Sequence, residues 1–267
     1  MNIININERI MAHKEKLISE GIDEKHILGI FLYGSQNYQC DFEGSDIDTK
    51  AIYIPSKEEA IFDKIRIKEY KLPNGEHCEL MDIRHFVDNL KKQNINFVEI
   101  LYTNYFWFNL AYDAIWVNGF LKYKDLISHY DMRRCISSIC GQAKHTLFQN
   151  PYNGKKVGNG LRLMYFLERY SENAPYEKCL IPNEATRNVI KHMKNQKMLD
   201  SRTTADDFFN YFCYLEPIML DEVDKIQKEK YKDIQENLDK NFRETIMLLI
   251  ETYDLLCTTE KLGKINE

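Results

Sequence analysis

Hydrophobic residues follow two different spacings along the chain, and the change comes near residue 115. Before it, short apolar runs are bounded by Gly, Pro and Asn, a pattern typical of strands and turns. After it, long segments carry apolar residues at helical spacing with few turn residues between them. The pattern predicts an α+β fold, in which a short mixed sheet flanked by helices is followed by an all-α part. We expect two domains, residues 1–120 and 121–267.

The elements of the first half can be placed from their caps and turns. Asn7 and Gly21 suit the two ends of an amphipathic helix over residues 7–20. The Asn74-Gly75 pair favours a tight hairpin turn, and Asn96 is placed to cap a short helix. The expected strands cover residues 26–33, 46–54, 64–72 and 76–83, with a helix over 84–92. In the second half the expected helices cover residues 128–149, 156–171, 183–198, 204–230 and 232–258.

The most informative segment is residues 31–52, FLYGSQNYQCDFEGSDIDTKAI. A hydrophobic strand ends at Gly34-Ser35, where a residue without a Cβ lets backbone N–H groups approach an anion and the serine adds a hydroxyl donor. Further on, Asp46 and Asp48 open the next strand. Residues two apart in a strand project from the same face, so the two carboxylates stand side by side while Ile47 points into the core.

Two neighbouring carboxylates suit a divalent cation. They repel each other unless a cation lies between them, and Mg²⁺ binds one or two carboxylates together with phosphate oxygens. A two-metal site needs a third carboxylate, for which the hairpin strand offers Glu79 and Asp82. These two have opposite parity in the strand, so at most one of them faces the site.

Gly34-Ser35 followed by Ser45-Asp46-Ile47-Asp48 resembles the signature of the DNA polymerase β-type nucleotidyltransferase superfamily. The chain is most similar to the predicted nucleotidyltransferases of bacteria and phages, through Asp82-Ile83-Arg84-His85-Phe86 and, more weakly, the segments 94–101 and 155–163. The resemblance covers about residues 25–190. It departs from the family pattern in three places, which are Thr49 for a hydrophobic residue, Ile95 for a proline and Asn159-Gly160 where a histidine is common.

The resemblance implies a reaction and a set of roles. A nucleoside monophosphate would pass from an NTP such as ATP to an acceptor hydroxyl, with Mg²⁺ or Mn²⁺ as cofactor and pyrophosphate as product. Asp46 and Asp48 would bind the metals. Asp82 would bind the catalytic metal and act as, or assist, the base that activates the acceptor hydroxyl, and its sequence context favours Asp82 over Glu79. The nucleotide would be held by Gly34, Ser35, Ser45, Lys156 and Arg162.

The charge distribution agrees with polyphosphate chemistry better than the total does. The net charge of −5 disfavours a long nucleic-acid duplex as partner. Residues 1–119 hold 13 Lys and Arg against 19 Asp and Glu, whereas residues 120–267 hold 23 against 22. Within residues 133–169 seven basic side chains accompany a single acid. An acidic site facing a basic segment is the arrangement that a metal and a polyphosphate require.

Other sequence features indicate a cytoplasmic protein without a membrane partner. No two of the seven cysteines form a Cys-x-x-Cys pair, and we expect all of them to be reduced thiols. The start of the chain lacks the basic and apolar stretches of a signal peptide. The most apolar window, residues 100–112, is too short to span a bilayer.

Several alternatives stay open at this point. A binding or regulatory protein could keep this fold and lose the chemistry, whereas a kinase lacks support because neither a Walker loop nor a kinase glycine loop is present. For Trp107 and Trp116, a role in the hydrophobic core is favoured over stacking on a nucleobase. The acceptor is compatible with a protein hydroxyl, an RNA 3′ end or a small molecule.

Overall fold

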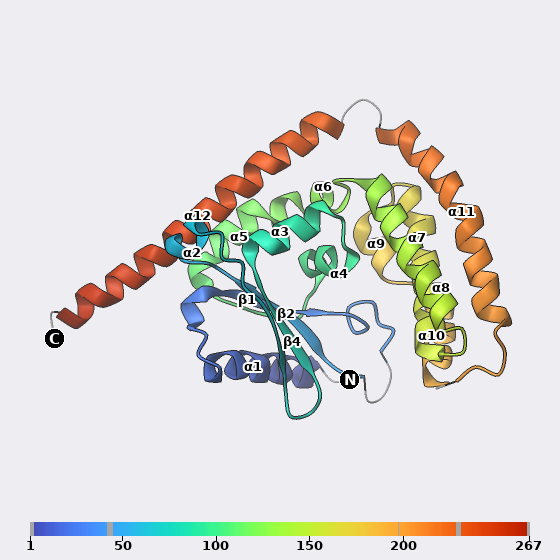
Figure 1. Ribbon diagram of the computed structural model, residues 1–267, viewed down its shortest axis with the longest axis horizontal. Coiled ribbons are helices and arrows are strands. Elements are labelled where there is room, and N and C mark those ends of the chain that lie inside the picture. Colours follow the sequence, from blue (N-terminus) through green and yellow to red (C-terminus); the bar gives the residue numbers. More distant parts are fainter. Residues whose placement is uncertain (1–2, 42–44, 197, 228–230, 266–267) are drawn as a thin grey trace.

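The computed structural model describes residues 3–41, 45–196, 198–227 and 231–265. It has a five-stranded mixed sheet flanked by helices and continues into a helical C-terminal part (Figure 1). The strands lie in the order β3-β4-β2-β1-β5. Their bounds are β1 Ile27–Tyr33, β2 Asp48–Tyr53, β3 Ile67–Lys71, β4 His77–Asp82 and β5 Phe106–Phe108.

The register of the central strands fixes what lies at each end of the sheet. β1 and β2 are antiparallel, with Tyr33 opposite Asp48, and β2 and β4 are parallel, with Tyr53 opposite Asp82. β3 and β5 pair antiparallel with β4 and β1. One end of the sheet therefore carries Tyr33 and Asp48, and the other end carries Tyr53 and Asp82.

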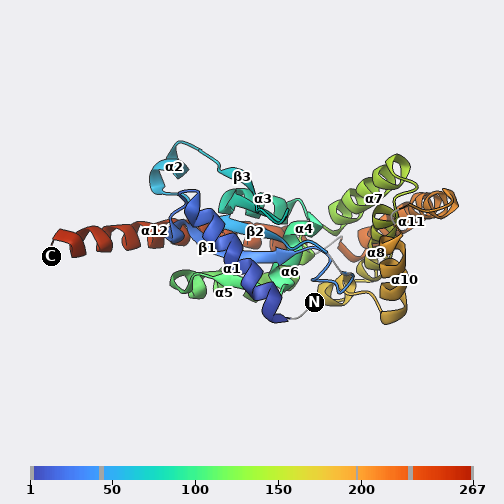
Figure 2. The ribbon, with the colours of Figure 1, turned by 90° about the horizontal axis from the view of Figure 1, so that it is seen from below.

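Helices cover both faces of the sheet, which explains why β1 is apolar almost throughout. α1 (Ile3–Ser19) packs its apolar side, including Ile10 and Leu17, on one face (Figures 1 and 2). The other face carries α3 (Ile83–Lys91), α4 (Ile95–Val98) and α5 (Asp113–Gly119). On that side the Trp116 ring stacks on Phe31 with 5.1 Å between ring centroids, as a core residue should.

The remaining elements are mostly helical. Short helices connect the larger ones: η1 Glu24–His26, α2 Lys57–Ile61, η2 Glu99–Tyr102, η3 Leu110–Tyr112, η4 Leu121–Tyr123, α6 Lys124–Ser128 and α9 Tyr176–Leu180. The longer helices are α7 Met132–Gln149, α8 Gly154–Ser171, α10 Glu184–Asn195, α11 Thr203–Gln227 and α12 Tyr231–Ile265.

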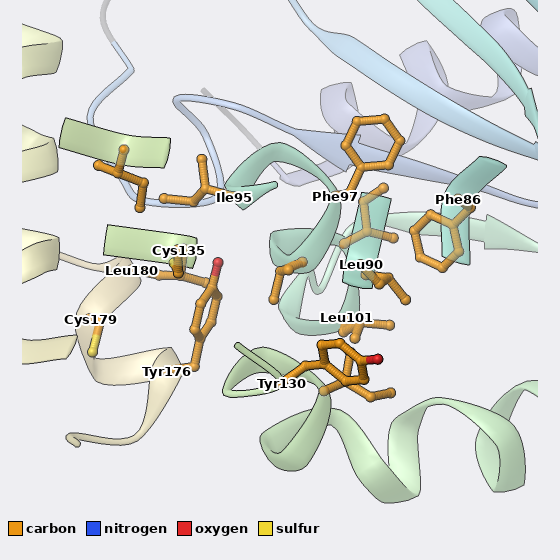
Figure 3. Packing of buried hydrophobic residues seen from close by; sticks show 14 of the residues in the cluster. Phe86, Leu90, Ile95, Phe97, Leu101, Tyr130, Cys135, Tyr176, Cys179 and Leu180 are labelled. Carbon is orange, nitrogen blue, oxygen red and sulfur yellow. The ribbon is translucent and has the colours of Figure 1, made fainter. Parts of the chain in front are cut away.

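One hydrophobic cluster joins the sheet to the helical part. Phe86 and Leu101 from the sheet side and Tyr176 and Leu180 from α9 belong to the same cluster (Figure 3). α12 then runs back from the helical part and packs on α5 and α2, and its C-terminal end projects beyond the body (Figures 1 and 2). His26 lies between the rings of Tyr53 and Tyr253, with centroid distances of 4.5 and 4.1 Å, and this contact attaches α12 to the sheet.

The α+β expectation is confirmed, with local corrections. α1 begins at Ile3, so Asn7 lies inside the helix and does not cap it. Asn94 caps α4 in place of Asn96, whose own backbone N–H is the donor. β5 was not expected, because an aromatic run of three residues has no readable period. Gly75 takes φ +90° in the hairpin turn as predicted. The division at residue 120 stays a prediction.

Within the described residues, no helix combines the length and the apolar character needed to cross a bilayer.

Candidate functional site

A cavity of about 260 Å³ opens at the Tyr33–Asp48 end of the sheet. It is walled by the segment after β1, the start of β2 and two helices of the C-terminal part. Six of the predicted residues line it, namely Gly34, Ser35, Ser45, Asp46, Asp48 and Lys156. It is also lined by Tyr33, Gln36, Tyr38, Asn96, Lys155, Asn159 and Lys194.

The loop after β1 is shaped by Gly34. This residue takes φ +96°, a conformation that costs a residue with a Cβ about 1 kcal/mol or more, and the chain turns there away from the sheet. The Gly34 N–H donates to Glu99 Oε1 across 3.0 Å. The anion contacts that we expected from backbone amides at this position therefore cannot come from Gly34 itself.

Glu99 stabilises the loop after β1 by accepting a hydrogen bond from the Gly34 N–H. Its side chain is buried, and Oε2 has no hydrogen-bond partner among the described residues. Burial raises the pKa of the Glu99 carboxyl to about 7, against the opposing effect of the Arg162 charge and the Gly34 N–H. The buried Glu99 carboxyl therefore supports the loop through the Gly34 N–H.

Asp48 is the first residue of β2, two residues later than expected, and Asp46 lies just before the strand. Both line the cavity, as their spacing predicts. Asp46 is exposed and Asp48 half-buried, while Ile47 between them is fully buried in the α1-side core. The Gln36 side-chain amide donates to the Asp46 carbonyl across 2.6 Å and so ties the loop to the acidic pair. Burial raises the pKa of the Asp48 carboxyl, partly offset by the neighbouring His77.

A buried polar network holds the acidic pair from the core side. Glu76 accepts a hydrogen bond from the Ile47 N–H across 3.0 Å and forms an ion pair with Arg9. His13 joins Glu76 to Thr49, with 3.2 Å to the carboxylate and 2.6 Å between Nδ1 and the Thr49 hydroxyl. Thr49, which departs from the family pattern, is thus a fully buried hydroxyl with a partner.

The C-terminal part contributes a basic wall. Lys155 and Lys156 are exposed in the first turn of α8, whose N-terminal end is capped by Asn153. Lys194 reaches the cavity from α10, and its Nζ donates to the Cys40 carbonyl across 3.0 Å. Burial lowers the pKa of Lys194 to about 8. Ammonium groups and a helix N-terminus both stabilise an anion, so this wall suits phosphate.

Arg162 does not reach the cavity, contrary to our expectation of a nucleotide contact. It is 3% exposed, its guanidinium lies 4.1 Å from the centre of the Tyr38 ring, and Nε donates to Asn159. Apolar neighbours in α8 turn this face of the helix inward. Arg162 therefore supports the Tyr38 loop and does not line the cavity.

Asp82 is not brought to the acidic pair, and its predicted metal role is corrected. In the β2–β4 ladder it lies opposite Tyr53, five residues along from Asp48, a separation of about 16 Å at the usual rise per residue. Its carboxylate caps α3 by accepting from the Arg84 N–H, and it is 0% exposed beside the Arg84 guanidinium at 2.7 Å. The Asp-Ile-Arg segment is thus a helix start with a buried ion pair.

Glu79, the alternative third carboxylate, lies on the face of the sheet that carries Asp48. It is opposite Lys50 in the register, and its carboxylate forms an ion pair with the Lys50 ammonium. It does not line the cavity itself. The parity rule therefore excludes Asp82 and retains Glu79 on the side of the site.

The two-carboxylate set is suited to one hard divalent cation. Asp46 and Asp48 both face the cavity, and Mg²⁺ or Mn²⁺ takes one or two carboxylates when phosphate oxygens supply further ligands. No group of three or more His, Cys, Asp or Glu side chains among the described residues has the geometry to hold a metal on its own. The donor set thus fits a metal that arrives with a polyphosphate better than a metal bound by protein alone.

Seven of the lining residues were not assigned to the site from the sequence. Tyr33, Gln36, Tyr38 and Lys194 carry no motif, because each is an ordinary residue of a strand, loop or helix that the fold brings to the cavity. Asn96 and Asn159 lie in the two segments of weaker resemblance, where no binding role was expected of them. Only Lys155 had a signal, through its pairing with Lys156.

Searches for relatives gave no match, either among protein-family models or among curated proteins.

Proposed function

We infer that this protein is a metal-dependent nucleotidyltransferase, which moves a nucleoside monophosphate from an NTP to an acceptor hydroxyl. One observation carries the proposal. Asp46 and Asp48 share a single cavity with Gly34-Ser35 and with three lysines from the opposite wall. A carboxylate pair facing an ammonium cluster matches the two ends of a metal-bound triphosphate.

The chain's own residues divide the work by charge. Asp46 and Asp48 would hold Mg²⁺ or Mn²⁺, which when bound neutralises charge on the transferring phosphoryl group. Lys155, Lys156 and Lys194 would orient the β- and γ-phosphates. The acceptor oxygen attacks the α-phosphorus, the bond to the β-phosphate oxygen breaks, pyrophosphate leaves and the hydroxyl proton passes to water. Positioning and charge neutralisation supply most of the catalysis in this class of reaction.

The acceptor enters from the open side of the cavity. A protein hydroxyl, an RNA 3′ end and a small molecule all present the required oxygen. The basic residues near the cavity lie on the tips of α8 and α10, so they offer a local contact and no extended track for a long duplex.

The test is transfer of label from each α-³²P-labelled NTP, with Mg²⁺ or Mn²⁺, to a cell lysate separated into protein, RNA and small-molecule fractions. We expect one fraction to be labelled by the wild type and not by Asp46→Asn or Asp48→Asn. Asp88→Asn, an exposed carboxylate on α3 away from the cavity, is the matched control and should label normally. Equal labelling by all three variants, or none by the wild type, would favour a protein that keeps the fold without the chemistry.

A further inference from the structure

We propose that the Lys50 ammonium takes the place of a second divalent cation, so that the cavity binds one divalent ion with each nucleotide. The inference rests on the proposed function. It gives Lys50, a residue that no motif indicates, the role of balancing the charge of Glu79. It concerns how charge is balanced around Asp46, Asp48 and Glu79.

The sheet register places Lys50 beside the acidic pair. Lys50 follows Asp48 by two residues on β2, so both side chains leave the same face of the strand. Glu79 lies directly opposite Lys50 on the parallel neighbour β4. The third carboxylate and the lysine therefore occupy the region where a second cation bridging Asp48 and Glu79 would have to lie.

The ammonium is held in place on several sides. Lys50 is 3% exposed, and its Nζ lies 4.3 Å from the centre of the Tyr33 ring and 4.5 Å from that of Phe97. Cation–π contacts are strongest when the cation is desolvated, as it is here. Together with the Glu79 ion pair, these two rings fix the charge before any ligand binds.

Displacing this ammonium would be costly. A second divalent ion that recruited Glu79 would leave a buried lysine without its carboxylate, and breaking a buried ion pair from one side is strongly destabilising. The ammonium already neutralises Glu79, so only Asp46 and Asp48 remain to attract a metal. Two carboxylates and the phosphate oxygens complete the coordination of one ion.

The experiment counts bound Mn²⁺. MnCl₂ is titrated into the full chain with equimolar α,β-methylene-ATP, and free Mn²⁺ is followed by EPR, with nucleotide alone as the reference titration. We expect the wild type to bind one Mn²⁺ per complex, and Lys50→Met, which frees Glu79, to bind two, with dipolar broadening between the ions. Lys50→Arg keeps the charge and should bind one. Lys144→Met, which removes a lysine paired with Glu216 in the helical part, should also bind one.

Each other outcome counts against the inference. Two ions in the wild type would overturn it while leaving the proposed function standing. One ion in a folded Lys50→Met variant would overturn it as well. Wild type that binds no more Mn²⁺ than Asp48→Asn would overturn both this inference and the proposed function.

A second variant covers the case in which Lys50→Met does not fold. Glu79→Gln keeps the size of the side chain and removes its charge. If Glu79 is partnered by Lys50 alone, this variant still binds one Mn²⁺. Loss of a bound ion in Glu79→Gln would identify Glu79 as a metal ligand and overturn the inference.

Discussion

The Glu76 carboxylate accepts a hydrogen bond from the Ile47 N–H across 3.0 Å, and the Glu76 side chain is buried beneath the start of β2. This contact joins the residue after the hairpin turn to the backbone between the two cavity aspartates. The same carboxylate carries the Arg9 ion pair and the contact to His13. The position of the acidic pair thus depends on a residue that does not line the cavity.

Replacing Glu76 should lower the free energy of unfolding. Glu76→Ala removes the buried carboxylate that pairs with Arg9 and accepts from the Ile47 N–H, and a hydrogen bond to a charged group is worth about 1.5–3 kcal/mol. Urea unfolding followed by circular dichroism measures the loss. The control is Glu244→Gln in α12, where the exposed Glu244 Oε1 lies 3.8 Å from the Lys240 Nζ. This variant should leave the urea midpoint unchanged. A Glu76→Ala midpoint equal to that of the control would contradict the role given to the network.

Substitutions at Asp82 and at Asp48 should have opposite effects, the first on stability and the second on label transfer. Asp82→Ala removes the cap of α3 and the partner of Arg84, and we expect a loss of about 1–2 kcal/mol for the cap alone. Label transfer per folded molecule should remain near the wild-type value, because the side chain lies at the far end of the sheet. Asp48→Ala should show the reverse, with a stable fold and no transfer. Abolished transfer in a folded Asp82→Ala protein would restore Asp82 to the site.

Lys156 should contribute to binding and little to stability. Its ammonium is exposed at the cavity wall, and a charge-assisted contact to phosphate is worth about 1.5–3 kcal/mol. Lys156→Ala should therefore lower the affinity for α,β-methylene-ATP by about tenfold or more, as measured by calorimetric titration. Lys178→Ala, an exposed lysine in α9, should bind as the wild type does.

Arg162 should behave differently from Lys156, because its guanidinium is buried under Tyr38. Arg162→Met removes the hydrogen bond to Asn159 and the ring contact, and we expect the protein to lose about 1–3 kcal/mol of stability. Limited proteolysis should then cut within the loop of residues 34–40 faster than in the wild type. Unchanged proteolysis together with weaker nucleotide binding would indicate a direct contact to the ligand instead.

Glu99 should make stability depend on pH in a defined window. Its folded pKa is raised to about 7 from 4.5, so between these values the folded protein binds more protons than the unfolded chain. The contribution of Glu99 to stability is therefore greatest below pH 4.5 and is lost as the pH rises to 7. Glu99→Gln keeps an acceptor for the Gly34 N–H, so its stability relative to the wild type should increase across this window and level off above it. Urea midpoints at several pH values test this, with Glu184→Gln, an exposed residue, as a control that should show no such trend.

The parts of the fold that sequence reasoning predicted are those with local signals. The apolar run of β1, the Asn74-Gly75 turn and the parity of Asp46 and Asp48 each depend on a few neighbouring residues. Asp82 was misassigned because its context is also that of a helix cap, and only the register of β2 and β4 separates the two readings. Arg162 was expected at the nucleotide, and Lys194 was given no role, for a similar reason. Which side of α8 and α10 faces the cavity depends on tertiary packing, which residue type does not report.

The basic wall also sets an order of events during synthesis of the chain. Asp48 leaves the ribosome more than a hundred residues before Lys155 and Lys194, and the cavity needs all three. Contacts between residues so distant in sequence form late, because closing a long loop costs entropy before the contact is gained. The acidic half of the cavity thus exists first without its cationic counterpart. In a nascent chain the two aspartates would lack these basic neighbours until α10 docks against the loop at Cys40, where Lys194 donates to the Cys40 carbonyl.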